Sequence, residues 1–368
     1  MKTLKADYTI GFLGAGQLAR MSALAAFRFG FKVASFSNRT EKEPLENVCD
    51  NHFKGSYDNI NDLVEFAKIC DVITLENEFI DGDILRELTR KSGTPLYPSP
   101  DTFELIENKF IEKQTFEEAG IEVAPYQMIE NSQDLESFGS DHGWPYVLKS
   151  SKGGYDGYGN ETVANKEDAV AAFQKLGGEK GHDIIAEAHV GFEKEIAVQV
   201  ARNQTGTAVY PCCETVQQGQ ICKAVLSPAR IDANIREKAR QLALAASEAI
   251  NMRGIFAYEF FLKSDGSLIL NESAPRPHNS GHYTIEGCVT SQFENHVRAV
   301  AGLPLGSTEL VHPAAAMINL LGTHERPASV ESAINLLETK EGHLHIYGKE
   351  QSRPGRKMGH FTKRGDNL

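Results

Sequence analysis

Residues 254–272 read GIFAYEFFLKSDGSLILNE and have the pattern of two strands joined by a tight turn. Aromatic and branched apolar residues dominate both halves, as is typical of strands. The Asp-Gly pair at 265–266 is typical of a type I′ turn, in which both central residues adopt a positive φ. A two-residue turn at this point predicts an antiparallel hairpin in which Glu259 lies directly opposite Glu272.

Two carboxylates that face each other across a strand pair repel one another. A cation between Glu259 and Glu272 relieves that repulsion, and two hard oxygen ligands suit Mg²⁺, which completes its shell with phosphate and water oxygens. Asn271 can add a neutral oxygen. The hairpin therefore predicts a Mg²⁺ site at the two glutamates. A strand end on a solvated face is the alternative, because glutamates are tolerated there.

The loop after the hairpin, residues 273–282, reads SAPRPHNSGH. Its prolines restrict the backbone, and Arg276 is suited to a bidentate contact with a phosphate or a carboxylate. A capped loop with one surface arginine is the plainer explanation, but it does not account for two histidines and an asparagine in the same short run. We therefore predict that the loop binds a ligand beside the metal.

A predicted strand at residues 146–149 leads into SSKGGYDGYG at residues 150–159, where four glycines fall within seven positions. The backbone N–H groups of such a loop can cover phosphates, with Lys149 as a point charge. A glycine-rich loop by itself is equally typical of a flexible turn. Together with the acidic pair, the loop and the lysine predict a nucleotide site.

The first 100 residues alternate strand-like runs with helical patterns. Strands are predicted at residues 9–13, 32–36 and 71–75, with a helix at about 17–29 after the first of them. This order predicts a parallel sheet with right-handed crossovers.

Two clusters of this N-terminal region are candidate ligand contacts. The loop at 14–16 resembles a loose dinucleotide fingerprint, but Asn38 follows the second strand where an NAD enzyme needs an acidic residue, so an NAD oxidoreductase is disfavoured. The N–H groups of the loop can still hold one phosphate, unless the loop only connects strand and helix. Residues 76–78, Glu-Asn-Glu, follow a buried strand at the carboxyl edge of the sheet, where ligands of open α/β sheets bind.

The C-terminal segment 345–360 reads HIYGKEQSRPGRKMGH, which predicts a strand, a Pro-Gly turn and a second strand. It holds four cations in a chain of net charge −12. A solvated basic hairpin is the usual explanation, but the interleaved Tyr347 and His360 favour an anion site. The remaining elements predicted are helices at 100–119 and 232–251 and antiparallel strands at 195–202 and 207–214.

The composition limits the classes of protein to consider. A chain of 368 residues predicts two or three domains. Its charge of −12 argues against broad binding to nucleic acid. The six cysteines form no CxxC pair and indicate reduced thiols in a cytoplasmic protein. We expect no signal peptide, no membrane span and no membrane partner.

Taken together, these segments resemble the N5-carboxyaminoimidazole ribonucleotide synthetase family of ATP-grasp ligases, in order and spacing over nearly the whole chain. The Glu259/Glu272 pair is common to all ATP-grasp enzymes, whereas RPHNSGH at 276–282 and RKMGH at 356–360 are far more specific. The matching motifs are GAGQLARM at 14–21, GGYDGYG at 153–159, RPHNSGHYT at 276–284, TSQFENH at 290–296, YGK at 347–349 and RKMGH at 356–360.

The resemblance implies an α/β and α+β fold in three parts. These are a Rossmann-like pre-ATP-grasp domain at residues 1–100, an ATP-grasp domain at 101–298 with a lid at about 120–188, and a small C-terminal domain at 299–368. Family analogy also implies a homodimer.

The resemblance further implies the site residues. It assigns ATP to Lys109, Lys149, Gly153, Gly154, Gly157, Gly159, Glu187, Ala188, His189, Val190, Glu195, Asn271 and Glu272. It assigns catalysis to Tyr155, Asp156, Arg276, His278 and Lys349, the ribonucleotide to Gly16, Gln17, Glu76, Asn279 and Arg356, and Mg²⁺ to Glu259 and Glu272.

The implied reaction is the carboxylation of 5-aminoimidazole ribonucleotide with ATP and bicarbonate, in purine biosynthesis. Bicarbonate attacks the γ-phosphate of ATP, and the substrate amine captures the resulting carboxyphosphate or its CO₂, with Asp156 as proton acceptor. Catalysis of this kind depends on positioning and charge neutralisation, and on a lid that excludes water.

Two positions depart from the family pattern. Tyr158 stands where the family usually has arginine or lysine, and Gln217 where it usually has a histidine close to the nucleotide. An ATP-grasp ligase with another amine or acid acceptor is therefore a second reading. A catalytically silent nucleotide-binding protein is a third, which the intact Glu259/Glu272 pair disfavours because such a protein needs no metal.

Overall fold

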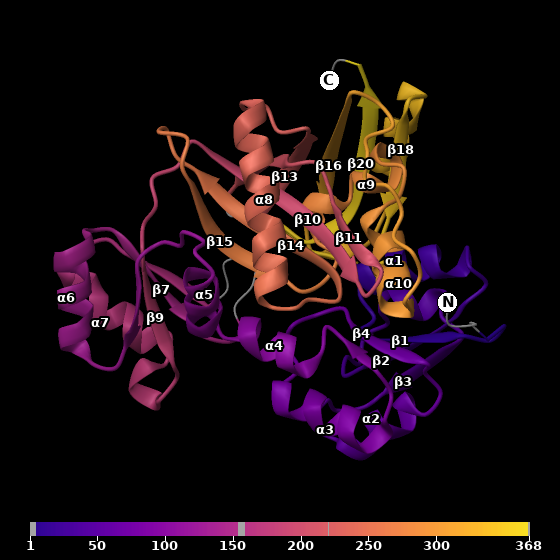
Figure 1. Cartoon of the computed structure of the whole chain (residues 1–368), viewed down its shortest axis with the longest axis horizontal. Coiled ribbons are helices and arrows are strands. Elements are labelled where there is room, and N and C mark those ends of the chain that lie inside the picture. The colour runs from indigo at the N-terminus through magenta and orange to yellow at the C-terminus, as the bar shows by residue number, and fades with distance from the viewer. Residues whose placement is uncertain (1–4, 154–158, 220, 367–368) are drawn as a thin grey trace.

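The computed structural model describes residues 5–153, 159–219 and 221–366. It contains the predicted mixture of α/β and α+β parts (Figure 1). Among these residues, no helix is both long and apolar enough to cross a membrane.

The N-terminal region forms a parallel sheet with the strand order β3-β2-β1-β4-β5. Helices α2 and α3 cover one face, and α1 packs with α10 on the other (Figure 1). The bounds are β1 (Thr9–Leu13), α1 (Gln17–Phe27), β2 (Lys32–Ser37), β3 (Asn51–Lys54), α2 (Ile60–Ala67), β4 (Val72–Leu75), α3 (Gly82–Ser92) and β5 (Leu96–Tyr97). The predicted parallel sheet is confirmed.

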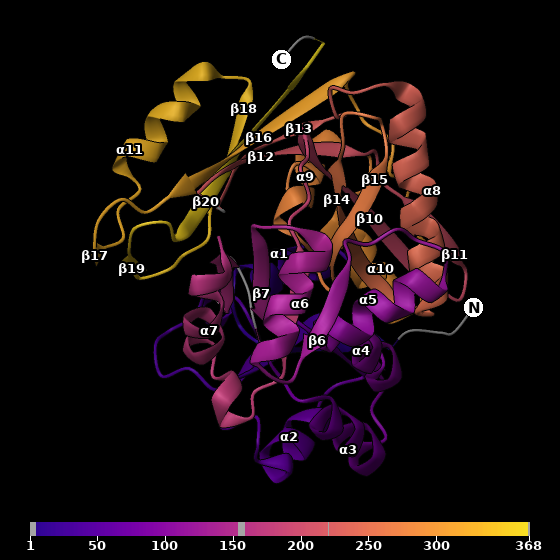
Figure 2. The same cartoon turned by 90° about the vertical axis from the view of Figure 1, so that its left-hand side faces the viewer.

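A small antiparallel sheet, in the order β6-β9-β7-β8, carries helices α6 and α7 and stands apart from the other sheets (Figures 1 and 2). The glycine loop at 150–159 connects β7 to β8. The bounds are β6 (Tyr126–Ile129), α6 (Ser132–His142), β7 (Tyr146–Ser150), β8 (Asn160–Val163), α7 (Lys166–Lys175) and β9 (Ile184–Ala188).

The large sheet runs in the order β15-β14-β10-β12-β13-β16-β20-β18, with β11 paired to β10. Its last three strands come from the C-terminal region, so that region extends the central sheet rather than forming a separate one (Figure 2). The bounds are β10 (Lys194–Asn203), β11 (Gly206–Val209), β12 (Cys213–Gln218), β13 (Ile221–Ser227), α8 (Ala233–Ala249), β14 (Gly254–Leu262), β15 (Leu268–Ala274), α9 (Thr284–Gly287), α10 (Gln292–Ala301), β16 (Ala314–Leu321), β18 (Gly342–Ile346) and β20 (Lys357–Gly365).

Short elements complete the described chain. They are the 3₁₀ turns at Pro44–Asn47, Gly178–Lys180, Asn279–Gly281 and Asn335–Thr339, helix α11 (Glu331–Ile334), and the strand pair β17 (Arg326–Pro327) and β19 (Gln351–Ser352). The domain limits at residues 100 and 298, and the limits of the lid, stay predictions.

The helix predicted at 100–119 is two helices, α4 (Pro100–Glu107) and α5 (Lys109–Glu118). Asn108 interrupts them because its side chain accepts hydrogen bonds from the N–H groups of Phe110 and Ile111, which gives the backbone an alternative to the helix. The break makes Lys109 the first residue of α5. Its N–H donates to Ser151 O at 2.8 Å, which ties the start of α5 to the glycine loop.

The strand predicted at 207–214 is likewise divided, into β11 and β12. Pro211 lies between them and has no N–H to donate to a neighbouring strand. The helix predicted at 232–251 is confirmed as α8, and the side chain of Asp232 caps its first turn.

The β14–β15 hairpin pairs Glu259 with Glu272, as predicted, but by another route. The turn is not type I′: Gly266 has a φ of +80°, whereas Asp265 has no positive φ. Lys263 N–H donates to Ser267 O and Gly266 N–H to Lys263 O, each at 3.0 Å, which is the pattern of a three-residue loop. That loop shifts the register by one residue.

A bulge then restores the pairing. Phe260 pairs with Leu270, and the next pair is Glu259 with Glu272, so Asn271 is the extra residue. An extra residue of this kind re-aims the side chains around it. The predicted opposition of the two glutamates therefore depends on two irregularities that offset each other.

Gly266→Ala tests this turn. A residue with a Cβ pays roughly 1 kcal/mol in the left-handed region, so the free energy of unfolding should fall by about that amount, measured by denaturant titration. Gly191→Ala is the matched control, because Gly191 has no positive φ and a Cβ there meets open space. Equal effects of the two substitutions would contradict the assigned turn.

Candidate functional site

A cavity of about 860 Å³ lies where the carboxyl ends of the N-terminal strands, the loop after β15 and the C-terminal hairpin meet. It brings together eleven of the predicted site residues: Gly16, Gln17, Glu76, Lys109, Gly153, Glu272, Arg276, His278, Asn279, Lys349 and Arg356.

Other predicted residues lie outside the lining of this cavity. They are Lys149, Gly159, Glu187, Ala188, His189, Val190, Glu195, Glu259 and Asn271. The predictions for Gly154, Tyr155, Asp156 and Gly157, and the departure at Tyr158, fall outside the residues that the structure describes.

Glu76 lies against the N-terminal glycine loop. A Cβ at Gly16 would overlap Glu76 Oε1, and one at Gly14 would come within 2.7 Å of Oε2, so the carboxylate approaches the loop closely because these residues are glycines. The N–H of Leu18, in the first turn of α1, donates to this carboxylate. Burial raises the pKa of Glu76 to about 7, against the opposing charge of Arg276. The loop therefore holds a carboxylate of the chain itself.

Arg276 makes a bidentate contact with Glu78. Its Nη2 donates to Glu78 Oε1 at 2.8 Å, and its Nε donates to Glu78 Oε2. This contact joins the loop after β15 to the end of β4. Arg276 therefore makes the bidentate contact with a carboxylate that the sequence predicted, but the carboxylate belongs to Glu78 and not to a ligand.

His278 and Asn279 have different surroundings. His278 Nδ1 lies 2.8 Å from Ser280 Oγ and 3.6 Å from Glu259 Oε1. Burial, with the charges of Arg276 and Lys357, lowers the pKa of His278 well below its usual value, so the ring is neutral. Asn279 instead exchanges two amide hydrogen bonds with Asn319, of 2.9 and 2.7 Å. Asn279 therefore anchors the loop to β16.

The basic hairpin supplies the cations of the opposite wall. Lys349 Nζ donates to Lys357 O at 2.8 Å. Burial and the charge of Arg356 lower the pKa of Lys349 to about 7, while Glu76 opposes the shift. Burial and Arg353 lower the pKa of Arg356 as well. Several cations close together and partly removed from water are a suitable site for an anion.

The acidic pair can accommodate a divalent cation. Glu259 and Glu272 are direct cross-strand partners, and Glu272 is exposed to the cavity. Burial disfavours the charged form of Lys109, but Glu272 and Glu112 outweigh it and raise the pKa of this lysine. Two carboxylates beside one ammonium form an oxygen donor set that still carries excess negative charge, which fits Mg²⁺.

On the nucleotide side, one carboxylate holds two lysines. Glu187 Oε2 lies 2.9 Å from Lys149 Nζ and 3.0 Å from Lys113 Nζ, and all three side chains are largely buried. Burial opposes ionisation of Glu187, yet the two ammonium groups lower its pKa. Burial lowers the pKa of Lys113. Lys149 therefore has a counterion that a phosphate group can replace, since Lys113 would still neutralise Glu187.

Glu195, on β10, lies close enough to Glu272 for the two carboxylates to repel each other. Burial raises its pKa, and Gln217 and Thr215 donate hydrogen bonds to its carboxylate. Gln217, one of the two departures from the family pattern, thus directly contacts Glu195, one of the residues predicted to bind ATP. Its own Oε1 is buried and has no hydrogen-bond partner within the described ranges.

Sequence reasoning missed Lys113, Glu112 and Asn319. Lys113 lies one helical turn after Lys109, and this i,i+4 spacing is the one sequence signal that could have indicated Lys113. Glu112 accepts from both the N–H and the hydroxyl of Ser273, at 2.8 and 2.6 Å, which fixes the strand end that carries Glu272. Glu112 and Ser273 are far apart in the sequence, as are Asn279 and Asn319, so these contacts become visible only in the folded chain.

Three family models match the chain. They are a ribonucleotide synthetase preATP-grasp domain at residues 8–107, an ATP-grasp domain at 114–293 and a phosphoribosylaminoimidazole carboxylase C-terminal domain at 315–368.

Individual relatives extend over most of the chain. It is 39% identical to an N5-carboxyaminoimidazole ribonucleotide synthase of Bacillus subtilis, over 96% of this chain and 90% of that one. It is 42% identical to a phosphoribosylaminoimidazole carboxylase of Ogataea methanolica over 96% of this chain, which spans only 66% of that protein. A structure of an Aspergillus clavatus N5-carboxyaminoimidazole synthase, in complex with ADP and 5-aminoimidazole ribonucleotide, superposes with a TM-score of 0.88 at 34% identity, covering 99% of this chain and 95% of that one.

Glu76→Gln should change how stability depends on pH. The carboxyl titrates near its ordinary value in the unfolded chain and at about 7 in the folded one. Between these values only the unfolded chain releases this proton, so the contribution of Glu76 to the free energy of unfolding falls as pH rises towards 7 and levels off above it. The glutamine variant lacks this decline, which amounts to up to about 3 kcal/mol.

Denaturant titrations from pH 5 to pH 8 measure the difference. Glu118→Gln, on an exposed position of α5, is the control and should follow the wild type. Parallel curves for Glu76→Gln and the wild type would show that Glu76 is ionised like any surface glutamate.

Proposed function

The chain belongs to the N5-carboxyaminoimidazole ribonucleotide synthetase family of ATP-grasp ligases, and from this premise we propose that it carboxylates 5-aminoimidazole ribonucleotide with bicarbonate and ATP. The observation that carries the proposal is one cavity with the acidic pair's Glu272 and Lys109 on one side and the cations Arg276, Lys349 and Arg356 on another. A cavity with both groups suits two phosphorylated reactants.

ATP binding would place the phosphates between Lys109, Lys149 and the glycine loop, with the adenine against residues 187–190 and the ribose hydroxyls at Glu195. Glu259 and Glu272 would hold Mg²⁺, which neutralises charge on the phosphates when bound. Lys149 would then exchange Glu187 for a phosphate. This step leaves a neutral Glu187–Lys113 pair rather than an unpaired buried charge, and an unpaired buried charge is costly.

The reaction proceeds in two displacements. A bicarbonate oxygen attacks the γ-phosphorus, the bond to the ADP oxygen breaks, and carboxyphosphate forms. The amine nitrogen of the ribonucleotide then attacks the carboxyl carbon, directly or after release as CO₂; phosphate leaves, and the nitrogen loses a proton to Asp156. The neutral ring of His278 and the charge of Arg276 would orient the bicarbonate.

The acceptor phosphate would lie at the basic hairpin. Lys349 has a pKa of about 7 without a bound anion. An anionic phosphate favours the charged form of a lysine, so binding would complete its protonation. Gly16, Gln17 and Glu76 would contact the rest of the ribonucleotide from the N-terminal sheet. We further propose a cytoplasmic homodimer, as the resemblance implies.

A second candidate is an ATP-grasp ligase with a different acceptor. Tyr158 removes a cation that the family pattern has, and Lys152, the nearest lysine in sequence, is held by Glu107 Oε1 at 2.5 Å rather than replacing it. The two candidates share the ATP site and differ in the amine that they use.

ADP release, followed in a coupled assay, should require both bicarbonate and 5-aminoimidazole ribonucleotide, with one carboxylated product for each ADP. Glu272→Gln should abolish ADP formation, since it removes a charged metal ligand, while Glu248→Gln, exposed on α8, should leave it unchanged. Near-normal turnover of Glu272→Gln at ordinary Mg²⁺ would exclude the metal assignment. Turnover with another amine in place of the ribonucleotide would favour the second candidate.

Arg356→Ala should raise KM for the ribonucleotide by about 10- to 100-fold, because a hydrogen bond to a charged group contributes roughly 1.5 to 3 kcal/mol. KM for ATP should change little. Steady-state kinetics with each substrate varied in turn measure both values, and Arg326→Ala, an exposed arginine of the same region, is the control. An equal rise in both KM values would show that the basic hairpin does not bind the phosphate of the ribonucleotide specifically.

A further inference from the structure

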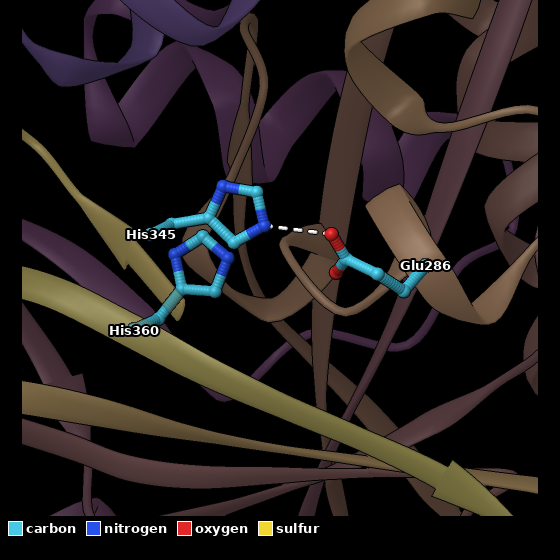
Figure 3. Close-up of side chains that lie close together, drawn as sticks. All are labelled: Glu286, His345 and His360. Atoms are coloured by element: carbon cyan, nitrogen blue, oxygen red, sulfur yellow. Dashed lines mark hydrogen bonds and ion pairs between the residues drawn. The ribbon is translucent and has the colours of Figure 1, made fainter. Parts of the chain in front are cut away.

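A second group of side chains that could bind a metal ion lies outside the lining of the cavity. Glu286 projects from α9, and His345 and His360 project from β18 and β20 (Figure 3). The two histidines are direct partners across the strand pair, and their rings stack at 4.4 Å between centroids and 13° between planes. One ligand atom from each of the three residues lies within 4.8 Å of the other two.

The hydrogen bonds within this group leave two buried atoms unused. His345 Nε2 lies 2.7 Å from Glu286 Oε1. Glu286 Oε2 and His360 Nε2 are buried and have no hydrogen-bond partner in the part of the chain that the structure describes. Buried polar atoms are rarely left without a partner, so these two indicate a missing occupant between them.

His360 is prepared as a ligand by its other nitrogen. Its Nδ1 lies 2.9 Å from the hydroxyl of Tyr347. When Nδ1 carries the hydrogen and donates to that hydroxyl, Nε2 presents its lone pair to Glu286, which is the arrangement usual for a metal-bound histidine. Burial, together with His282 and His345, lowers the pKa of His360 well below its usual value and keeps the ring neutral.

The charge of the group also suits a cation. Arg364 donates to the main-chain oxygen of Glu286 at 3.0 Å, not to its carboxylate. One carboxylate with two neutral imidazoles leaves a net charge of about −1. Imidazole nitrogen with a single carboxylate is a donor set for zinc-type ions, whereas Mg²⁺ prefers oxygen ligands.

We propose that Glu286, His345 and His360 bind a divalent transition-metal ion of the zinc type, at a site distinct from the acidic pair. The ion replaces the hydrogen between His345 Nε2 and Glu286, and the ring takes a hydrogen on Nδ1 in its place, so the imidazole stays neutral and no net proton is released. Bonds of about 2.0 to 2.2 Å in a tetrahedron require donor atoms roughly 3.4 Å apart. His345, whose side chain is 26% exposed, can turn to reach this spacing, and water completes the shell.

Such an ion would join two distant parts of the chain. Glu286 follows the loop that carries Arg276 and His278, while His345 and His360 belong to the strands that carry the basic hairpin. The ring of His282, which lines the cavity, lies 5.2 Å from that of His360. The ion would therefore fix two walls of the cavity from behind, whatever acceptor the enzyme uses.

Zinc titration of the whole, chelator-treated protein tests the site. Equilibrium dialysis with elemental analysis should find one more bound Zn²⁺ in the wild type than in His345→Ala or Glu286→Gln, or binding weakened at least about tenfold in these variants. Zinc held by Glu259 and Glu272 persists in every variant and does not confuse the comparison. His312→Ala, an exposed histidine, should match the wild type.

Thermal unfolding supplies the second measurement. Added Zn²⁺ should raise the midpoint of the wild type and of His312→Ala by more than that of His345→Ala, where only zinc at the acidic pair remains. Equal stoichiometry and equal midpoint shifts in wild type and His345→Ala would overturn the proposal. So would the absence of zinc binding beyond the acidic pair, which would mean that an ordered water alone bridges the three residues.

Discussion

One buried histidine joins the two sheets between which the cavity lies. His296 projects from α10; its Nδ1 accepts from the N–H of Ile255 on β14 at 3.3 Å, and its Nε2 lies 3.0 Å from the hydroxyl of Thr74 on β4. Because Nδ1 accepts, Nε2 carries the hydrogen and donates to Thr74, whose hydroxyl donates in turn to Tyr97 O at 2.7 Å. Burial lowers the pKa of His296 to about 3, so this chain of bonds holds at any ordinary pH. Since β4 leads to Glu76 and β14 carries Glu259, the histidine ties together the two strands that lead to the opposite sides of the site.

Charges around the cavity are arranged so that arriving anions exchange partners rather than meet bare groups. Lys149 rests on Glu187, and Arg276 rests on Glu78. Lys349 and Glu76 both have pKa values of about 7, because burial disfavours the charged form of each side chain. Nearby opposite charges offset this effect of burial only in part. A phosphate that stabilises the ammonium form of Lys349 draws a proton into the site, which balances its own charge. The bound state needs these charged groups to hold its anions. In the free protein they are paired or neutral, which avoids the cost of an unpaired buried charge.

Local signals in the sequence predicted strands β1, β2 and β4 of the parallel sheet, though not β3 or β5, together with helix α8 and the opposition of Glu259 and Glu272. Alternation, capping and turn residues act over a few positions. The same signals failed where tertiary contacts decide. Asn108 divides a helix that periodicity continues, and the type I′ turn is wrong because a three-residue loop and a bulge at Asn271 give the same pairing. The same contrast holds for the site residues. Sequence motifs indicated Lys109, Arg276 and Lys349. The contact of Lys113 and Lys149 with one carboxylate, Glu187, depends on folding, which brings these side chains together.

The continuity of the large sheet bears on how the acceptor is selected. Strand β16 pairs with β13 and β20, so the C-terminal strands share one ladder with the strands that carry the acidic pair. Asn319 on β16 holds both Asn279 and the carbonyl of Cys222, which fixes the loop after β15 to this ladder. A rigid frame of this kind leaves little freedom for the backbone around the reacting groups. A change of acceptor is therefore expected to come from cavity-lining side chains outside the paired strands, such as Arg353 and Arg356, while the metal and nucleotide contacts stay in place.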